Sequence, residues 1–349
     1  MKLLYIGKQI IKTTSGADQI NKRNQQLLTN IFRGEIAYVE PIGDSPLDKL
    51  VLGVNKQMIS LVKKELEKGS YTHVFISQSI MGRIIKIIKK QYPSIEIINF
   101  FHNIEVQYAY EYFKTYGFKA LPFFLTVKFW EHIGCTYSDK FITLNNRDSI
   151  LLKDIYGKIS TIELPTSFDD KFDNQKASSV EKDIKLEPID YLFVGVAFFA
   201  NIHGVQWFID NVMPQLNGEF YIIGKGMDTV PFKNLTPNIH IHGFVDDLDS
   251  FYYRAKMVVS PIFVGGGMKT KTAEALMYGK TIVGTEETFV GYELDNQCMH
   301  KCTTPTEFVH TILSLENSPK LNLHSRDLFN KNYSTQTALR KLKSIFYEL

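Results

Sequence analysis

Two lysines and a glutamate follow three consecutive glycines late in the chain, a spacing suited to holding a phosphate group. Because the glycines lack Cβ atoms, their backbone can take positive φ and let a ligand approach closely. Lys269 and Lys271 fall in the first turn of a helix expected over 268–278, where free amides and the helix dipole concentrate positive charge. Cations are unfavourable there, which indicates a bound phosphate or diphosphate. The glycines are Gly265, Gly266 and Gly267.

Glu274 lies three residues after Lys271, which places both side chains on one face of the expected helix. The patch therefore combines free amides, an ammonium group and a carboxylate. An ordinary strand–helix connection with surface lysines is the alternative interpretation, because glycine loops that open helices are common.

The stretch 261–285 reads PIFVGGGMKTKTAEALMYGKTIVGT. It resembles the donor-site signature of GT-B glycosyltransferases, especially glycosyltransferase family 4 in its triglycine variant. The resemblance implies that Lys271 binds the donor diphosphate and that Glu274 holds the ribose of the nucleotide. Lys269 takes the place of an arginine in the family pattern. Gly266 stands where many members carry the first glutamate of a pair, so the sugar contacts of that glutamate are not implied.

Further residues of the second half correspond to parts of the family's donor site. Relatives often carry an arginine beside the glycine that ends the first strand of this half and a lysine several residues later, whereas Val196 and Asn201 stand in comparable places here. Phosphate neutralisation would therefore fall mainly to Lys269 and Lys271. The acidic cluster 246–249 looks like a metal-binding Asp-x-Asp motif, but helix capping is the preferred interpretation, and neither a metal nor a cofactor is expected. The additional donor-binding candidates are Gly195, Lys225, Phe244 and Val245.

Two polar segments of the first half are candidates for acceptor binding. His102 and Glu105 directly follow an expected strand, where parallel sheets bind ligands, and the segment resembles the His-Asn segment of family 4. The imidazole could hydrogen-bond a sugar hydroxyl or a phosphate, or only satisfy a loop carbonyl. A polar loop over 13–18 resembles the family's acceptor loop, or is a turn that caps the next helix. Its candidates are Ser15, Gly16 and Asp18.

Strands and helices alternate in two series, which predicts two parallel sheets covered by helices. With the resemblance, this gives an α/β fold of two Rossmann-like domains that face each other across a cleft. The first domain is expected over 1–168 and the second over 189–330, with 169–188 as linker or loop. The resemblance implies that 331–349 packs back on the first domain. Strands are expected at 2–6, 36–39, 73–76, 95–100, 140–144, 191–194, 220–223, 239–242, 257–260 and 281–284.

The chain has 349 residues, 44% of them hydrophobic, and a formal charge of +3. This is enough for two globular domains, and the charge is too small to indicate nucleic-acid binding.

Three sparse cysteines fit a reducing cytosol, and no apolar run approaches the roughly 20 residues of a membrane span. Basic residues within 63–90 and the aromatic stretch 121–130 also allow docking on the inner face of a membrane. Solvated lysines over an ordinary core are the alternative.

These features together predict a cytoplasmic glycosyltransferase that moves a sugar from a nucleotide diphosphate sugar to a glycan or lipid-linked acceptor, in the synthesis of surface polysaccharide or glycoconjugates. The resemblance implies retention of the anomeric configuration and no required metal. Two alternatives stay open: a glycan-binding or partner-binding protein of this fold without activity, and a sugar-nucleotide 2-epimerase. The catalytic candidates are His102, Lys271 and Glu274.

Overall fold

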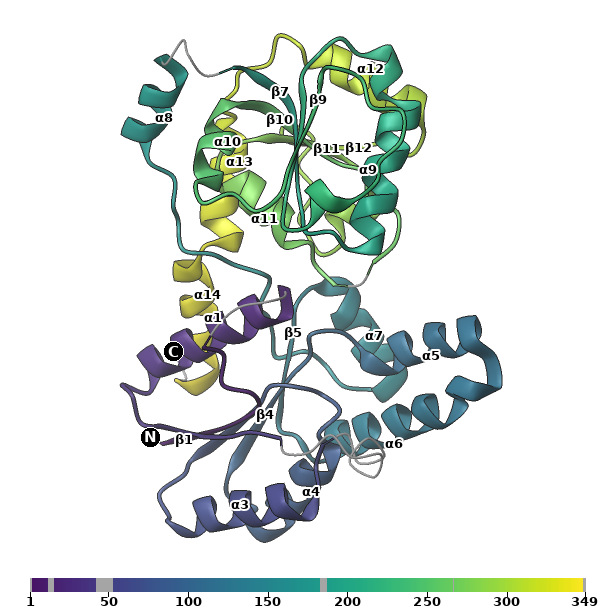
Figure 1. The fold of residues 1–349 in the computed structure, drawn as a ribbon. Coiled ribbons are helices and arrows are strands. Elements are labelled where there is room, and N and C mark those ends of the chain that lie inside the picture. The colour runs from purple at the N-terminus through teal and green to yellow at the C-terminus, as the bar shows by residue number, and fades with distance from the viewer. Residues whose placement is uncertain (1, 12–15, 42–52, 183–186, 266, 348–349) are drawn as a thin grey trace. The chain divides into compact units, whose positions relative to one another are not determined.

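The computed structural model describes residues 2–11, 16–41, 53–182, 187–265 and 267–347 (Figure 1). The chain divides into two compact units, and each contains one parallel sheet. Unit 1 comprises Met1–Pro165 and Ala338–Leu349, and unit 2 comprises Thr166–Thr337. The units therefore divide after residues 165 and 337, where the sequence predicted divisions after 168 and 330.

The sheet of unit 1 has the strand order β2-β1-β3-β4-β5-β6. This is the order of flavodoxin-like folds, in which the direction of strand addition reverses between β1 and β3. The strands are β1 (Leu3–Ile6), β2 (Ile36–Val39), β3 (His73–Ile76), β4 (Glu96–Phe100), β5 (Lys140–Thr143) and β6 (Ile162–Glu163). The helices are α1 (Gly16–Ile31), α3 (Lys56–Glu67), α4 (Gly82–Gln91), α5 (Glu105–Tyr116), η1 (Gly117–Ala120), α6 (Leu121–Tyr137), α7 (Asn146–Tyr156) and α14 (Thr335–Phe346).

Helices cover both faces of this sheet. Its central strands are therefore buried on both sides, and their sequences are almost continuous apolar runs. The C-terminal helix α14 starts in unit 2 and its last turns pack on unit 1. The ring of Phe346 makes edge contacts with Phe32, at 4.9 Å between centroids, and with His73, at 5.2 Å. Lys140 Nζ also donates a hydrogen bond of 2.6 Å to the carbonyl oxygen of Ile345. These contacts make the end of the chain part of the core of unit 1.

The sheet of unit 2 has the order β12-β11-β10-β7-β8-β9, so the direction of strand addition reverses between β7 and β10. Dinucleotide-binding Rossmann folds have this order, and they bind ligands at that reversal. The strands are β7 (Ile189–Val194), β8 (Phe220–Ile223), β9 (Ile239–His242), β10 (Ala255–Ser260), β11 (Thr281–Gly284) and β12 (Met299–Lys301). The helices and short turns are α8 (Asn174–Lys182), α9 (Phe199–Asn211), η2 (Met213–Gln215), η3 (Met227–Thr229), α10 (Leu248–Arg254), α11 (Thr270–Met277), η4 (Glu286–Phe289), α12 (Pro305–Ser314), α13 (Leu323–Leu328) and η5 (Phe329–Tyr333).

All ten expected strands are confirmed to within two residues at each end, whereas the short strands β6 and β12 were not expected. Among the described helices, none has both the length and the apolar character to cross a bilayer. Residues 174–182 form a helix where the polar composition of 169–188 predicted a linker or loop. This helix is α8, and it belongs to unit 2. The guanidinium of Arg326 forms two hydrogen bonds, of 2.9 and 2.6 Å, with the carboxylate of Asp170. Phe172 packs edge-on against Tyr253 at 5.8 Å.

Helix α9 lies very close to the end of β10 because Gly204 has no side chain. A Cβ atom on Gly204 would lie 2.0 Å from the carbonyl oxygen of Pro261, the residue that follows β10. This close approach brings α9 over the carboxyl edge of the sheet, where β7 and β10 are neighbours.

We expect Gly204→Ala to lower the free energy of unfolding by about 1–3 kcal/mol, because the added methyl group overpacks this contact. The better helix propensity of alanine offsets only about 1 kcal/mol of that cost. Urea unfolding followed by circular dichroism measures the change. His203→Ala, at an exposed position of the same helix, is the control and should stay within about 0.5 kcal/mol of wild type. Equal stability of the two variants would contradict the packing argument.

Candidate functional site

Two helices of unit 2 begin at the point where the strand order reverses. Four residues separate the end of β7 from the start of α9, and α11 follows the glycine loop after β10. Neither helix start receives a hydrogen bond from the side chain of its N-cap residue. Uncapped amides and the helix dipoles favour an anion at both starts. The strand order therefore brings two anion-favouring backbone segments to one edge of the sheet.

Lys271 joins these two helix starts. Its Nζ donates a hydrogen bond of 2.7 Å to Oδ1 of Asn201 in the first turn of α9. The same ammonium lies 4.3 Å from the centre of the Phe193 ring in β7. Nδ2 of Asn201 in turn donates to the carbonyl oxygen of Val196, at 2.8 Å. Asn201 thus fixes both the lysine and the loop after β7.

Gly195 provides the room that this arrangement needs. A Cβ atom on Gly195 would lie 2.9 Å from Nζ of Lys271 and 2.9 Å from Nδ2 of Asn201. The glycine predicted from the sequence as a donor-binding residue therefore does lie beside Lys271. Any side chain at this position would displace the ammonium from its place.

Among the described residues, no carboxylate forms a hydrogen bond or ion pair with Lys271, whose acceptor is the neutral amide of Asn201. Burial lowers the pKa of the Lys271 ammonium to about 7, and the nearby charge of Lys269 acts in the same direction. The Glu274 charge, one turn along the helix, raises the Lys271 pKa but by less than the effects that lower it. A half-buried ammonium of this kind is stabilised by any anion that binds beside it. The site therefore favours a ligand with negative charge.

Lys269 has a different environment, although the sequence presents it as equivalent to Lys271. Its Nζ donates to Oε1 of Glu287 at 2.7 Å and to the carbonyl oxygen of Gly267 at 3.0 Å. Only 12% of the Lys269 side chain and 19% of that of Glu287 are exposed. The ion pair compensates this ammonium and holds the glycine loop, in which Gly267 has a φ of 63°. Gly265 lies next to the pair, with its Cβ position 3.1 Å from Cε of Lys269, while Gly266 is outside the described residues.

Glu274 offers a carboxylate one turn further along α11. No side chain or backbone group of the described residues donates a hydrogen bond to it, and burial raises its pKa to about 7. Tyr292 holds the first turn of the same helix through two hydrogen bonds. Its hydroxyl donates to the carbonyl oxygen of Lys269 at 2.6 Å and accepts from the amide of Ala273 at 3.2 Å. Glu274 is therefore held on a fixed helix and has capacity to accept hydrogen bonds from a ligand.

The other donor candidates follow β8 and β9 at the same sheet edge. Lys225 is exposed, and its carbonyl oxygen accepts a hydrogen bond of 3.0 Å from the amide of Ala197. Phe244 is 75% exposed, and Val245 is half-buried. Asp247 is the N-cap of α10 and accepts from the amide of Ser250, which confirms the capping interpretation of 246–249. In the described part of the chain, no group of three or more His, Cys, Asp or Glu side chains could hold a metal ion.

In unit 1, His102 lies after β4 and contacts α1. Its Nε2 is 2.9 Å from Oδ1 of Asn21, and because an amide oxygen can only accept, Nε2 carries the proton. Nδ1 has no hydrogen-bond partner among the described residues. Burial lowers the pKa of His102 to about 4, and the nearby Arg23 guanidinium adds to this effect. The ring is therefore neutral at pH 7, with Nδ1 as an acceptor.

Glu131 is a buried carboxylate that the sequence did not indicate. It lies in α6 and accepts four hydrogen bonds, two from hydroxyl groups and two from the first amides of α5. The donors are Ser79 Oγ (2.6 Å), Tyr156 OH (2.7 Å), Glu105 N (3.0 Å) and Val106 N (2.9 Å). Glu131 therefore fixes the start of α5 and, with it, Glu105. Burial and the Glu131 charge raise the pKa of the Glu105 side chain to about 7.

The predicted acceptor loop is only partly described. Helix α1 begins at Gly16, three residues earlier than the sequence predicted, so Gly16 and Asp18 belong to its first turn. The expectation of a loop is wrong at these two positions, because the acidic residue near the helix start favours an extra turn. Ser15 lies outside the described residues.

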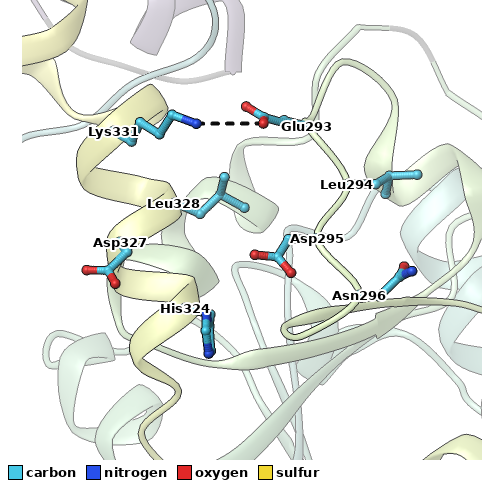
Figure 2. A pocket seen from close by; sticks show the side chains of 8 residues that line it. All are labelled: Glu293, Leu294, Asp295, Asn296, His324, Asp327, Leu328 and Lys331. Atoms are coloured by element: carbon cyan, nitrogen blue, oxygen red, sulfur yellow. Dashed lines mark ion pairs between the residues drawn. The ribbon is translucent and has the colours of Figure 1, made fainter.

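A pocket of about 330 Å³ lies elsewhere in unit 2 (Figure 2). Across it, Nζ of Lys331 and Oε1 of Glu293 form an ion pair of 3.8 Å. The lining residues are Glu293, Leu294, Asp295, Asn296, His324, Asp327, Leu328 and Lys331. None of the predicted site residues lines this pocket, so it is separate from the site around Lys271.

Residues 188–318 match the family model described as Glycosyl transferases group 1. The match covers β7 to α12, and with them the whole site around Lys271. No curated protein matches the chain in sequence.

Solved structures share the fold over the entire chain. HepE of Anabaena in complex with UDP has 11% identity and a TM-score of 0.72, with 100% of each chain covered. The chain has the GT-B glycosyltransferase fold. Sucrose-phosphate synthase from Thermosynechococcus elongatus has 13% identity and a TM-score of 0.72, covering 99% of this chain and 98% of that one. WaaG, a glycosyltransferase involved in lipopolysaccharide biosynthesis, has 13% identity and a TM-score of 0.68, covering 98% and 99%.

The GT-B fold that the motif indicated is thus confirmed, and residues 188–318 of unit 2 match the group 1 glycosyl transferase model. The motif that led to the family also contains the lysine that joins α9 and α11. Asn201 was noted in the sequence only because it replaces a family lysine, and nothing in the spacing indicated its contact with Lys271.

We expect Glu131→Gln to lower the free energy of unfolding by about 1–3 kcal/mol. The glutamine amide nitrogen cannot accept, so one or two of the four buried donors lose their acceptor. Urea unfolding measures the loss. Glu111→Gln removes an exposed carboxylate of α5 and serves as the control, with little expected change. If both variants unfold at the same urea concentration as wild type, Glu131 does not fix the start of α5.

Proposed function

We propose that this protein is a glycosyltransferase that moves a sugar from a nucleoside diphosphate sugar to a glycan or lipid-linked acceptor. One observation carries the proposal. The ammonium of Lys271 lies where the strand order of unit 2 reverses, joined to the start of α9 by a neutral amide, and no carboxylate of the described residues pairs with it. A diphosphate fits that place because its negative charge matches the ammonium and its oxygens can accept hydrogen bonds from the free backbone amides.

The proposed reaction is driven by electrostatic stabilisation of the leaving group. When the bond between the sugar and the diphosphate breaks, negative charge grows on the departing oxygen. Lys271 and the amides at the starts of α9 and α11 are already in position before the reaction, and they stabilise that charge as it forms. Lys269 keeps the glycine loop in position through Glu287, and we propose no required metal.

Glu274 is proposed to accept hydrogen bonds from the ribose hydroxyls of the donor, because its carboxylate lacks other donors. Phe244, which is 75% exposed, is proposed to contact the base beside Val245. In unit 1, Nδ1 of His102 is proposed to accept a hydrogen bond from an acceptor hydroxyl. Gly16, Asp18 and Glu105 stay candidates for acceptor binding.

Two structural neighbours support the proposed pathway. HepE binds UDP, and WaaG is involved in lipopolysaccharide biosynthesis. We therefore propose a role in the synthesis of surface polysaccharide or glycoconjugates, with retention of the anomeric configuration. The three cysteines are free and buried, which supports the proposed cytoplasmic location.

We expect Lys271→Met to weaken the binding of a nucleoside diphosphate by about tenfold to a hundredfold, because a charge-assisted hydrogen bond contributes about 1.5–3 kcal/mol. Isothermal calorimetry with UDP, GDP and ADP measures the affinity and identifies the base. The control is Lys233→Met, which removes an exposed lysine of the same unit and should leave the affinity unchanged.

The same titration separates the proposal from its alternatives. If wild type binds none of the three nucleotides, the protein is better explained as a glycan-binding or partner-binding protein without activity. If it binds one of them and converts the matching sugar nucleotide without any acceptor, an epimerase is the better explanation. Release of nucleoside diphosphate only in the presence of an acceptor supports the transferase.

We expect the affinity for the diphosphate to fall above pH 7, at up to about tenfold per pH unit. In the free protein the pKa of Lys271 is about 7, and a bound diphosphate raises it, so binding above pH 7 requires proton uptake. Calorimetry between pH 7.5 and 9, in buffers of different ionisation enthalpy, measures that uptake. Lys271→Arg keeps its charge at these pH values and should flatten the dependence. An equally steep fall in both proteins would mean that another group titrates.

A further inference from the structure

Tyr252 in α10 carries a buried hydroxyl group that has no hydrogen-bond partner among the described residues. Only 1% of this residue is exposed, so bulk water does not replace the missing partner. A buried polar group in this state destabilises a protein, whereas the ring of phenylalanine would fill the same space and has no polar group to satisfy. The hydroxyl therefore indicates a role other than the stability of the fold.

The ring of Tyr252 is held against the end of α11. It stacks on the ring of Tyr278, with 4.5 Å between the ring centres and 10° between the planes. Tyr278 lies one turn after Glu274, and its amide donates a hydrogen bond of 3.1 Å to the carbonyl oxygen of Glu274. The hydroxyl of Tyr278 donates to Oδ1 of Asp249, so its proton is already in use. Tyr252 thus brings an unpartnered hydroxyl to the turn of α11 that begins with Glu274.

Glu274 has the complementary deficiency, because no described group donates a hydrogen bond to its carboxylate. The two side chains interact electrostatically: burial, and next the charge of Glu274, raise the pKa of Tyr252 well above its usual value. A phenol can donate a hydrogen bond and a carboxylate can accept one. Stacking fixes the ring of Tyr252, whereas the Glu274 side chain can rotate about its single bonds. The carboxylate is therefore the partner that can turn to complete the contact.

Helix α10 also links Tyr252 to the proposed contact with the base. The helix begins at Leu248, three residues after Val245, and Tyr252 lies one turn further on. A nucleoside whose base lies beside Phe244 and Val245 and whose ribose lies at Glu274 would have α10 on one side and α11 on the other. Tyr252 is therefore in a suitable place to act on the ribose contact.

We propose that the Tyr252 hydroxyl donates a hydrogen bond to the Glu274 carboxylate when a nucleotide binds, and that this bond orients the carboxylate toward the ribose hydroxyls. Tyr252 is a positioning residue, because its own hydroxyl is buried below the surface. One carboxylate can serve all of these donors, since its two oxygens offer about four acceptor sites. This inference rests on the proposed function and deepens it.

The contact would define the class of the sugar donor. A site built to hydrogen-bond a hydroxyl discriminates against an analogue that lacks it, because the polar groups of the site are then left unpaired. The preferred donor is therefore a ribonucleoside diphosphate sugar, and sugars carried by deoxyribonucleoside diphosphates, such as that of thymidine, are disfavoured.

The experiment compares ribonucleoside and 2′-deoxyribonucleoside diphosphates by isothermal calorimetry, with wild type and with Tyr252→Phe. The pairs are UDP with dUDP, GDP with dGDP and ADP with dADP. We expect wild type to bind the ribo form of its base about tenfold more tightly than the deoxy form. Tyr252→Phe removes one oxygen atom and keeps the stacking, and it should reduce that ratio about threefold or more.

Tyr221→Phe is the matched control. Tyr221 is also buried in unit 2, but its hydroxyl donates to Oε2 of Glu187 at 3.1 Å, so its removal should leave the ratio unchanged. Urea unfolding gives a second readout. Because the Tyr252 hydroxyl has no described partner in the free protein, Tyr252→Phe should unfold at the wild-type urea concentration or above it.

The outcomes separate this inference from the proposed function. If wild type binds none of the nucleoside diphosphates, the transferase and the role of Tyr252 are overturned together. If wild type binds the ribo and deoxy forms equally, or if Tyr252→Phe keeps the full wild-type ratio, only the role of Tyr252 is overturned. A full ratio together with a lower urea midpoint would assign the hydroxyl to stability instead.

Discussion

The site in unit 2 depends on an ammonium group that is partly removed from water and that contacts only neutral groups among the described residues. Lys271 is held by the amide of Asn201 and the ring of Phe193, and neither provides negative charge. Two helix starts add further positive potential at the same edge. Such an arrangement is unfavourable in the free protein, and it becomes favourable when an anion binds. The strand order makes it geometrically possible, because it brings the ends of β7 and β10 together.

Lys269 and Lys271 are two residues apart in sequence, and their environments show how one motif can serve two purposes. Lys269 forms an ion pair with Glu287 and holds the glycine loop by its carbonyl oxygen. Its charge is therefore compensated before any ligand arrives. Lys271 points to the neighbouring helix start and keeps its charge for a ligand. The first lysine stabilises the loop, and the second gives the site its preference for anions.

The sequence predicted most of the fold, because buried parallel strands are short apolar runs that end in glycine or proline. It missed β6 and β12, which have two and three residues, too few to make a pattern. It also missed α8, whose polar residues resemble those of a loop. The motif predicted Lys271 and Glu274 as candidates but did not distinguish Lys269. Partners such as Asn201 and Glu131 depend on contacts between residues 25 to 70 positions apart, which spacing alone does not reveal.

In unit 1, one helix connects the candidate acceptor residues with several exposed tyrosines. Helix α5 starts at Glu105, where Glu131 holds its first amides, and ends at Tyr116. Its 12 residues span roughly 18 Å. Glu131, a buried carboxylate of α6, thus fixes both the position of Glu105 and the start of the helix that carries the exposed tyrosines.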